Sequence, residues 1–153
     1  VQGDEPFIQA KQIETLQACF NDHHTEIATF IKAFPYNGLF DELADMNTPK
    51  VVINKKMEAM YFSRSVIPYK RGTDRNHWLD KHTYSKHIGM YAYQADVLKA
   101  ITSLPPSSLA LAESLEQLRW LENGYKIKVG ITDVETIGID TPDDLEKANK
   151  ILK

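Results

Sequence analysis

Two acidic loops carry the carboxylates that are best suited to metal chemistry. Asp4 lies in the sequence Gly-Asp-Glu-Pro at 3–6, and Asp140 lies in Gly-Ile-Asp-Thr-Pro at 138–142. In open α/β sheets, ligands collect at the carboxyl ends of strands, where such loops are expected. Mg²⁺ commonly binds one or two carboxylates and keeps its other positions for water and phosphate oxygens. The pair could hold a Mg²⁺, but a turn residue and a helix cap would give the same pattern.

A second group of candidates lies in or directly after predicted strands. Arg64 follows Tyr-Phe-Ser at 61–63, where a guanidinium could bind a carboxylate or a phosphate through two hydrogen bonds. His87 and Tyr91 are four residues apart on a predicted strand, so alternation puts both on one face with Gly89 between them. A small residue between two hydrogen-bonding rings leaves room for a ligand. Both rings could equally satisfy their polar atoms inside the sheet.

A predicted helix over residues 109–123 offers a polar face. Its leucines at 111, 115 and 118 form one stripe at helical spacing. The opposite side then carries four residues: Glu113, Glu116, Gln117 and Trp120. Carboxylate and amide groups there could bind a polyhydroxylated ligand, although a solvated outer face is the ordinary explanation.

Other features limit the choice of partner and compartment. The histidines at 23, 24, 77 and 82 lack a third ligand at metal-site spacing and are predicted to lie on the surface. Cys19 is the single cysteine, so no internal disulfide can form. A net charge of -3 without a Lys/Arg cluster argues against nucleic acid or an anionic membrane as the main partner. A small substrate in the cytoplasm is the expectation.

Helical and strand patterns alternate along the chain and must position these residues. Helices are predicted at 9–20, 39–46, 95–103 and 109–123, and strands at 26–34, 51–53, 60–62, 86–93 and 125–132. The polar stretch 70–85 has no period and is predicted to be a long surface loop. A closing helix is predicted from Thr141 as N-cap and Pro142 as first helical residue. This alternation predicts an α/β sandwich with a mixed sheet.

Five motifs occur in order along nearly the whole chain. They are Val-Gln-Gly-Asp-Glu-Pro at 1–6, Tyr-Phe-Ser-Arg-Ser at 61–65 with Ile-Pro at 67–68, His-Ile-Gly-Met-Tyr-Ala-Tyr at 87–93, Glu-Ser-Leu-Glu-Gln-Leu-Arg at 113–119 and Gly-Ile-Asp-Thr-Pro at 138–142. This series resembles the ordered motifs of CMP-Kdo synthetases, which join CMP to the eight-carbon sugar acid Kdo (3-deoxy-manno-octulosonate). The resemblance implies a Rossmann-like nucleotide-diphospho-sugar transferase sandwich.

The resemblance also implies an activity and its partners. Members of the family transfer CMP from CTP to Kdo, releasing diphosphate, for lipopolysaccharide synthesis, and are typically Mg²⁺-dependent homodimers. Asp4 and Asp140 match the two metal-binding aspartates, and Gln2 and Gly3 match positions close to the nucleotide. Five residues match positions that line the sugar-acid pocket: Arg64, as a partner of the Kdo carboxylate, and His87, Tyr91, Glu116 and Gln117.

The family's pattern extends beyond this chain. Its members open with a Gly- and Arg-containing nucleotide loop and a CTP pocket, which residues 1–153 do not contain. We therefore expect residues 1–153 to be the C-terminal portion of a single cytidylyltransferase domain, incomplete at the N-terminus and inactive alone. Two alternatives stay open: a cytidylyltransferase for another sugar acid, such as a sialic acid, and a non-catalytic sugar-binding or dimerisation module.

Overall fold

The centre of the protein is a five-stranded mixed sheet. The structure is a computed structural model that describes residues 8–134. Its strands are β1 Ile27–Ala33, β2 Lys50–Ile53, β3 Ala59–Ser63, β4 Ser85–Tyr93 and β5 Ile127–Ile131, in the spatial order β3-β2-β4-β1-β5. Strand β1 runs antiparallel to β4 and parallel to β5, while β2 is antiparallel to both β3 and β4. The expected α/β fold with a mixed sheet is confirmed.

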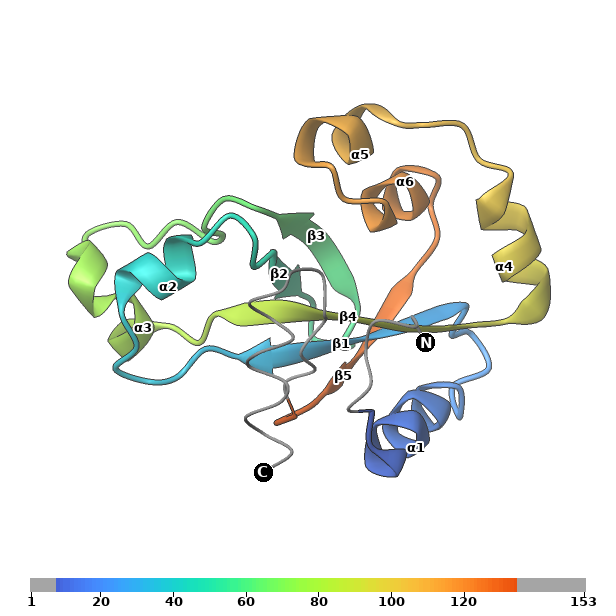
Figure 1. Ribbon diagram of the computed structural model, residues 1–153, viewed down its shortest axis with the longest axis horizontal. Helices are drawn as coiled ribbons and strands as arrows, with labels where there is room; N and C mark the ends of the chain where they lie inside the picture. Colours follow the sequence, from blue (N-terminus) through green and yellow to red (C-terminus); the bar gives the residue numbers. More distant parts are fainter. Residues whose placement is uncertain (1–7, 135–153) are drawn as a thin grey trace, which may run out of the picture.

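Helices cover both faces of this sheet (Figure 1). They are α1 Ala10–Cys19, α2 Phe40–Ala44, α3 Trp78–Lys81, α4 Ala95–Thr102, α5 Ser108–Glu113 and α6 Gln117–Glu122, with a 3-10 turn, η1, at Arg75–His77. Helix α1 lies on one side of the sheet, and α5 and α6 lie on the other. Helices α2 and α3 lie beyond one end of the sheet.

Alternation along β1 separates the two packed layers. Ile27 and Ile31 belong to the cluster that includes α6, whereas Ala28 and Phe30 pack with Leu16 of α1 on the opposite face. A strand buried on both faces must carry an almost continuous apolar run, and β1 does so from its first residue. Thr29 interrupts this run on the α6 face, although its side chain is fully buried.

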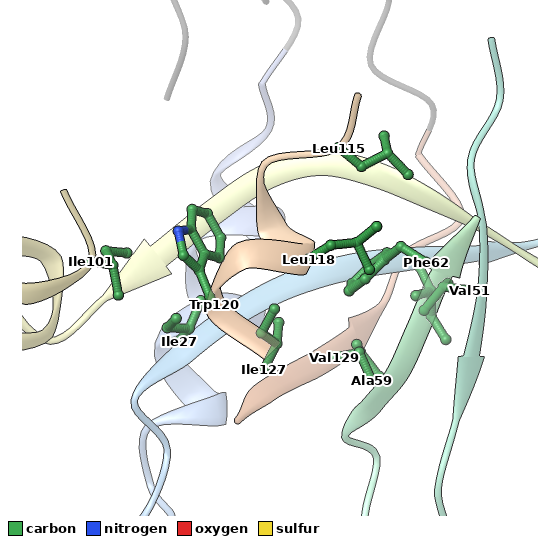
Figure 2. Close-up of a cluster of buried hydrophobic side chains, with 11 residues drawn as sticks. Ile27, Val51, Ala59, Phe62, Ile101, Leu115, Leu118, Trp120, Ile127 and Val129 are labelled. Carbon is green, nitrogen blue, oxygen red and sulfur yellow. The ribbon is translucent and has the colours of Figure 1, made fainter. Parts of the chain in front are cut away.

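The larger core layer joins α6 to the sheet. Leu118 is fully buried and lies near Phe62, while Trp120 lies near Ile27 and Ile127 (Figure 2). Residues two positions apart lie on different sides of a helix, so α6 is buried over a wide arc, and both Leu118 and Trp120 belong to the same core cluster. This packing fixes the position of the segment before α6, which carries Glu116.

Most element predictions are confirmed to within two residues at each end. The helix predicted over 109–123 is wrong, because it consists of α5 and α6. Ser114 adopts a left-handed conformation with φ 50°, and the amide of Leu115 donates to the carbonyl of Ala110. The break shifts the helical phase, so that Leu111 is 69% exposed instead of joining Leu115 and Leu118 in the core.

The segment 70–85 is not wholly a surface loop. It contains η1 and α3, and it buries Trp78, Leu79 and Tyr84 against Phe34 and Leu43. Hydrogen bonds from Trp78 Nε1 to the Thr73 carbonyl and from the Tyr84 hydroxyl to the Pro68 carbonyl fasten it further. Large aromatic side chains supply this anchoring without any period in the sequence. The closing helix predicted from residue 141 lies outside the described residues.

Candidate functional site

A cavity of about 270 Å³ lies between β4 and the start of α6. Its walls are His87, Gly89, Tyr91, Tyr93, Leu115, Glu116, Gln117 and Trp120. Four predicted sugar-acid residues therefore meet here from segments about 25 positions apart in the chain. Two larger hollows of about 430 Å³ each have mostly apolar walls, so they offer few groups that could orient a polyhydroxylated ligand. The polar groups in its walls, rather than its volume, make the smaller cavity the candidate site.

A bulge in β4 shapes the cavity wall. Thr29 of β1 pairs with Tyr91, but its neighbour Phe30 pairs with Ile88, so β4 accommodates two extra residues between these pairs. Two extra residues preserve the alternation of faces. His87 and Tyr91 consequently stay on one side, with their ring centroids 5.3 Å apart. The spacing argument for a shared face agrees with the structure, although the strand is irregular between the two residues.

His87 is held as a neutral ring. Its Nε2 lies 2.9 Å from Thr29 Oγ1, and its ring meets Phe62 edge-on with centroids 5.0 Å apart. Burial lowers the pKa of His87 to about 4, because the charged imidazolium would lose its hydration. At neutral pH the ring therefore offers hydrogen bonds and no positive charge.

Three aromatic side chains form the deeper wall. The ring of Trp120 meets Tyr91 and Tyr93 edge-on, with centroid distances of 5.2 and 5.6 Å. Burial, aided by the negative charge of Glu116, raises the pKa of Tyr93 to about 12, and burial also raises the pKa of Tyr91 well above its ordinary value. Both phenols keep their protons at neutral pH. The wall is aromatic and uncharged at neutral pH.

Sequence reasoning did not select Tyr93 as a site residue and placed Trp120 only on a polar helix face. The signal for Tyr93 was available, since alternation puts it on the same face of β4 as Tyr91. Trp120 is 5% exposed and belongs to the core as well as to the cavity. Its double role depends on the break at Ser114, which no helical period reveals.

Glu116 and Gln117 reach the cavity from the turn that opens α6. The Gln117 residue is 6% exposed. The Glu116 carboxylate accepts a hydrogen bond from Arg119, whose guanidinium also donates to the Leu104 carbonyl at 3.1 Å. The Glu116 side chain is 67% exposed, so this ion pair is screened by water and contributes little to stability. It does set the direction of the carboxylate.

Arg64 is not among the residues that line the cavity. Its Nε donates to the Glu113 carbonyl at 2.6 Å, and its two terminal nitrogens donate to the carbonyls of Met46 and Ser114 at 2.8 and 3.2 Å. The Glu113 carboxylate in turn accepts from the Ser63 hydroxyl and the Arg64 amide at 2.7 and 2.9 Å. Arg64 thus ties the end of β3 to the turn that leads to Glu116.

The other candidates have mixed outcomes. Gln2, Gly3, Asp4 and Asp140 lie outside the described residues. Between residues 8 and 134, no group of three His, Cys, Asp or Glu side chains could hold a metal ion. The histidines at 23, 24, 77 and 82 are exposed, as predicted.

The fold is that of an α/β nucleotide-sugar transferase. A solved structure described as CMP:2-keto-3-deoxy-manno-octonic acid synthetase complexed with CTP matches 99% of this chain and 59% of its own, with a TM-score of 0.86 and 41% identity. A family model described as cytidylyltransferase matches residues 1–127. The chain belongs to this cytidylyltransferase family.

Curated relatives agree with the structural match. The chain is 63% identical to a protein of Bacteroides thetaiotaomicron and 53% identical to one of Porphyromonas gingivalis, over its full length in both cases. Both relatives are named 3-deoxy-manno-octulosonate cytidylyltransferase. The chain spans only 61% and 60% of their lengths. The resemblance inferred from the five motifs is confirmed.

Proposed function

We propose that the complete protein transfers CMP from CTP to Kdo, giving CMP-Kdo and diphosphate. The observation that carries the proposal is the cavity in which His87, Tyr91, Glu116 and Gln117 meet. All four match the family's sugar-acid positions, and the names of the relatives point to the same acid. The description of the solved relative, which names CTP, supports the nucleotide.

The reaction is an in-line displacement. The anomeric hydroxyl of Kdo attacks the α-phosphorus of CTP, a new P–O bond forms, and the bond to the leaving diphosphate breaks. Neutral His87 and the buried phenols suit this task, because they can orient sugar hydroxyls without adding charge. The aromatic wall keeps water from that side of the acceptor. No described side chain is assigned as the base that takes the hydroxyl proton.

Asp4 and Asp140 are the proposed ligands of a Mg²⁺. Their donor set fits this ion, since Mg²⁺ takes carboxylate oxygens and leaves positions for substrate phosphates. When bound, the ion supplies charge neutralisation of the triphosphate and alignment of its groups. Gln2 and Gly3 are proposed to lie close to the nucleotide.

Arg64 is the proposed partner of the Kdo carboxylate. A guanidinium has five N–H donors, and three are used by the carbonyls described above. Two donors remain for a carboxylate at the edge of the cavity. Of the lining residues that lie within 8–134, Glu116 is the only carboxylate and none is a cation, because His87 is neutral. The sugar acid therefore needs a cation from outside the lining.

The cellular setting of the proposed enzyme follows from the family. We propose a homodimer that acts in the cytoplasm in lipopolysaccharide synthesis. Through residues 8–134, no helix combines the length and apolar character that a membrane crossing requires.

Diphosphate release by the complete protein with CTP, Mg²⁺ and Kdo tests the proposal, with a sialic acid as the comparison substrate. Release with Kdo alone is the expected result. Release only with the other acid would keep the chemistry and overturn the substrate. No release with either acid would favour the sugar-binding or dimerisation module.

Substitution of Gly89 by alanine tests whether the cavity is the acceptor site. A Cβ built on Gly89 meets no atom within 4 Å, so we expect the stability to be unchanged within about 0.5 kcal/mol. The added methyl group narrows the cavity, and we expect the KM for Kdo to rise about tenfold while the KM for CTP changes little. Steady-state kinetics with each substrate varied in turn measure both constants. An unchanged KM for Kdo would contradict this location of the acceptor.

A further inference from the structure

The hydroxyl of Thr29 lies within hydrogen-bond distance of three groups, and the Tyr91 phenol lies beside it. Its Oγ1 is 2.9 Å from His87 Nε2, 2.9 Å from the Met90 carbonyl and 3.3 Å from the Ile88 carbonyl. The residue is fully buried. Both carbonyls lie at the β4 bulge, where Gly89 and Met90 have no partner residue on β1. No solvent competes for these bonds.

The chemistry of these groups determines which of them is the donor in each hydrogen bond. A carbonyl oxygen can only accept, and a hydroxyl has a single proton. Thr29 therefore donates to the carbonyls, with Met90 at the shorter distance. The remaining contact is satisfied only if His87 Nε2 carries a proton and donates it to Thr29 Oγ1.

The state of the opposite ring nitrogen follows from this direction. His87 is neutral at pH 7, so its ring carries one proton, and Nε2 holds it. Nδ1 then has a free lone pair. Within residues 8–134 no group bonds to Nδ1, and His87 lines the cavity. The rings of Phe62 and Tyr91, at 5.0 and 5.3 Å, limit rotation of the imidazole.

We propose that Thr29 is a positioning residue that fixes His87 in its Nε2–H tautomer, so that Nδ1 accepts a hydrogen bond from a hydroxyl of the acceptor sugar. This inference rests on the proposed function only for the identity of the ligand. It specifies what the site recognises at this point: a hydroxyl that donates, and not a carboxylate. Thr29 contacts no substrate and acts through the ring alone.

The first test reads the tautomer directly and needs no substrate. Side-chain ¹⁵N shifts of His87 in the complete protein are expected to show a protonated Nε2 and an unprotonated Nδ1 at pH 7. In Thr29→Val, which keeps the shape and removes the hydroxyl, the Nδ1–H form is expected to appear. In Thr29→Ser the wild-type pattern is expected to persist. A protonated Nδ1 in the wild type would overturn the proposal even if the valine variant fails to fold.

The second test separates positioning from simple structural support. Thr29→Val is expected to raise the KM for Kdo about tenfold, the loss of roughly one hydrogen bond, with kcat and the KM for CTP little changed. Thr29→Ser is expected to restore the KM. Equal KM values for valine and serine variants would overturn the role of the hydroxyl. If the wild type releases no diphosphate with any acid, the proposed function fails, and the ¹⁵N shifts alone then decide the tautomer.

Discussion

Replacing Asp4 or Asp140 with asparagine is expected to lower kcat for diphosphate release by the complete protein about 100-fold or more. Asparagine keeps the size of the side chain and removes the negative charge that a divalent cation needs. A bound metal contributes several kcal/mol of charge stabilisation in displacement reactions, and each 1.4 kcal/mol corresponds to a factor of ten. Initial rates over a range of Mg²⁺ concentrations measure the effect.

The Mg²⁺ dependence and a control variant make this prediction specific. Each variant is expected to need a higher Mg²⁺ concentration for half-maximal rate than the wild type. Asp96→Asn makes the same chemical change at an exposed carboxylate in the first turn of α4 and is expected to leave the rate unchanged. Wild-type rates in both loop variants would return Asp4 and Asp140 to the roles of turn residue and helix cap.

The described lining of the cavity contains no cation, and this has a consequence for substrate choice. His87 is neutral, both phenols are protonated, and Glu116 bonds to Arg119. A lining of this kind favours hydroxyl groups over anions. The carboxylate of the proposed acceptor must therefore bind a cation outside this lining, which supports its assignment to Arg64.

The predictable part of the fold is the part governed by local pattern. In β1 and β4, the side chains alternate in polarity or form an apolar run, depending on which faces of the strand are covered by helices. This pattern can be read directly from the sequence. Matching of motifs added the functional grouping: His87 and Tyr91 with Glu116 and Gln117. Neither composition nor periodicity could have paired β4 with the start of α6.

The unpredicted features depend on single residues and on tertiary contacts. Ser114 is a polar residue with no glycine signal, yet it adopts a left-handed conformation that divides α5 from α6. The β4 bulge becomes visible only when Thr29 and Phe30 are paired with their partners across the ladder. Trp78 anchors a stretch that looks like a loop, because one buried ring can outweigh the absence of a period.

Replacing Trp120 with alanine is expected to lower the free energy of unfolding by about 3–5 kcal/mol. Trp120 is 5% exposed and packs in the cluster that contains Ile27 and Ile127, so its removal leaves a void that the sheet cannot fill (Figure 2). Tyr91 and Tyr93 lose their edge-on contacts at the same time. Urea unfolding of the complete protein, followed by fluorescence and circular dichroism, measures the change.

Two further variants show whether packing is the cause. Trp120→Phe retains an aromatic ring and removes a buried indole N–H that has no hydrogen-bond partner among residues 8–134, so a smaller loss of about 1–2 kcal/mol is expected. Leu111→Ala truncates a side chain that is 69% exposed on α5 and is expected to cost less than about 0.5 kcal/mol. Because Trp120 also lines the cavity, Trp120→Phe is expected to raise the KM for Kdo more than Leu111→Ala does. Equal stability losses for the alanine variants at 120 and 111 would contradict the packing of α6 against the sheet.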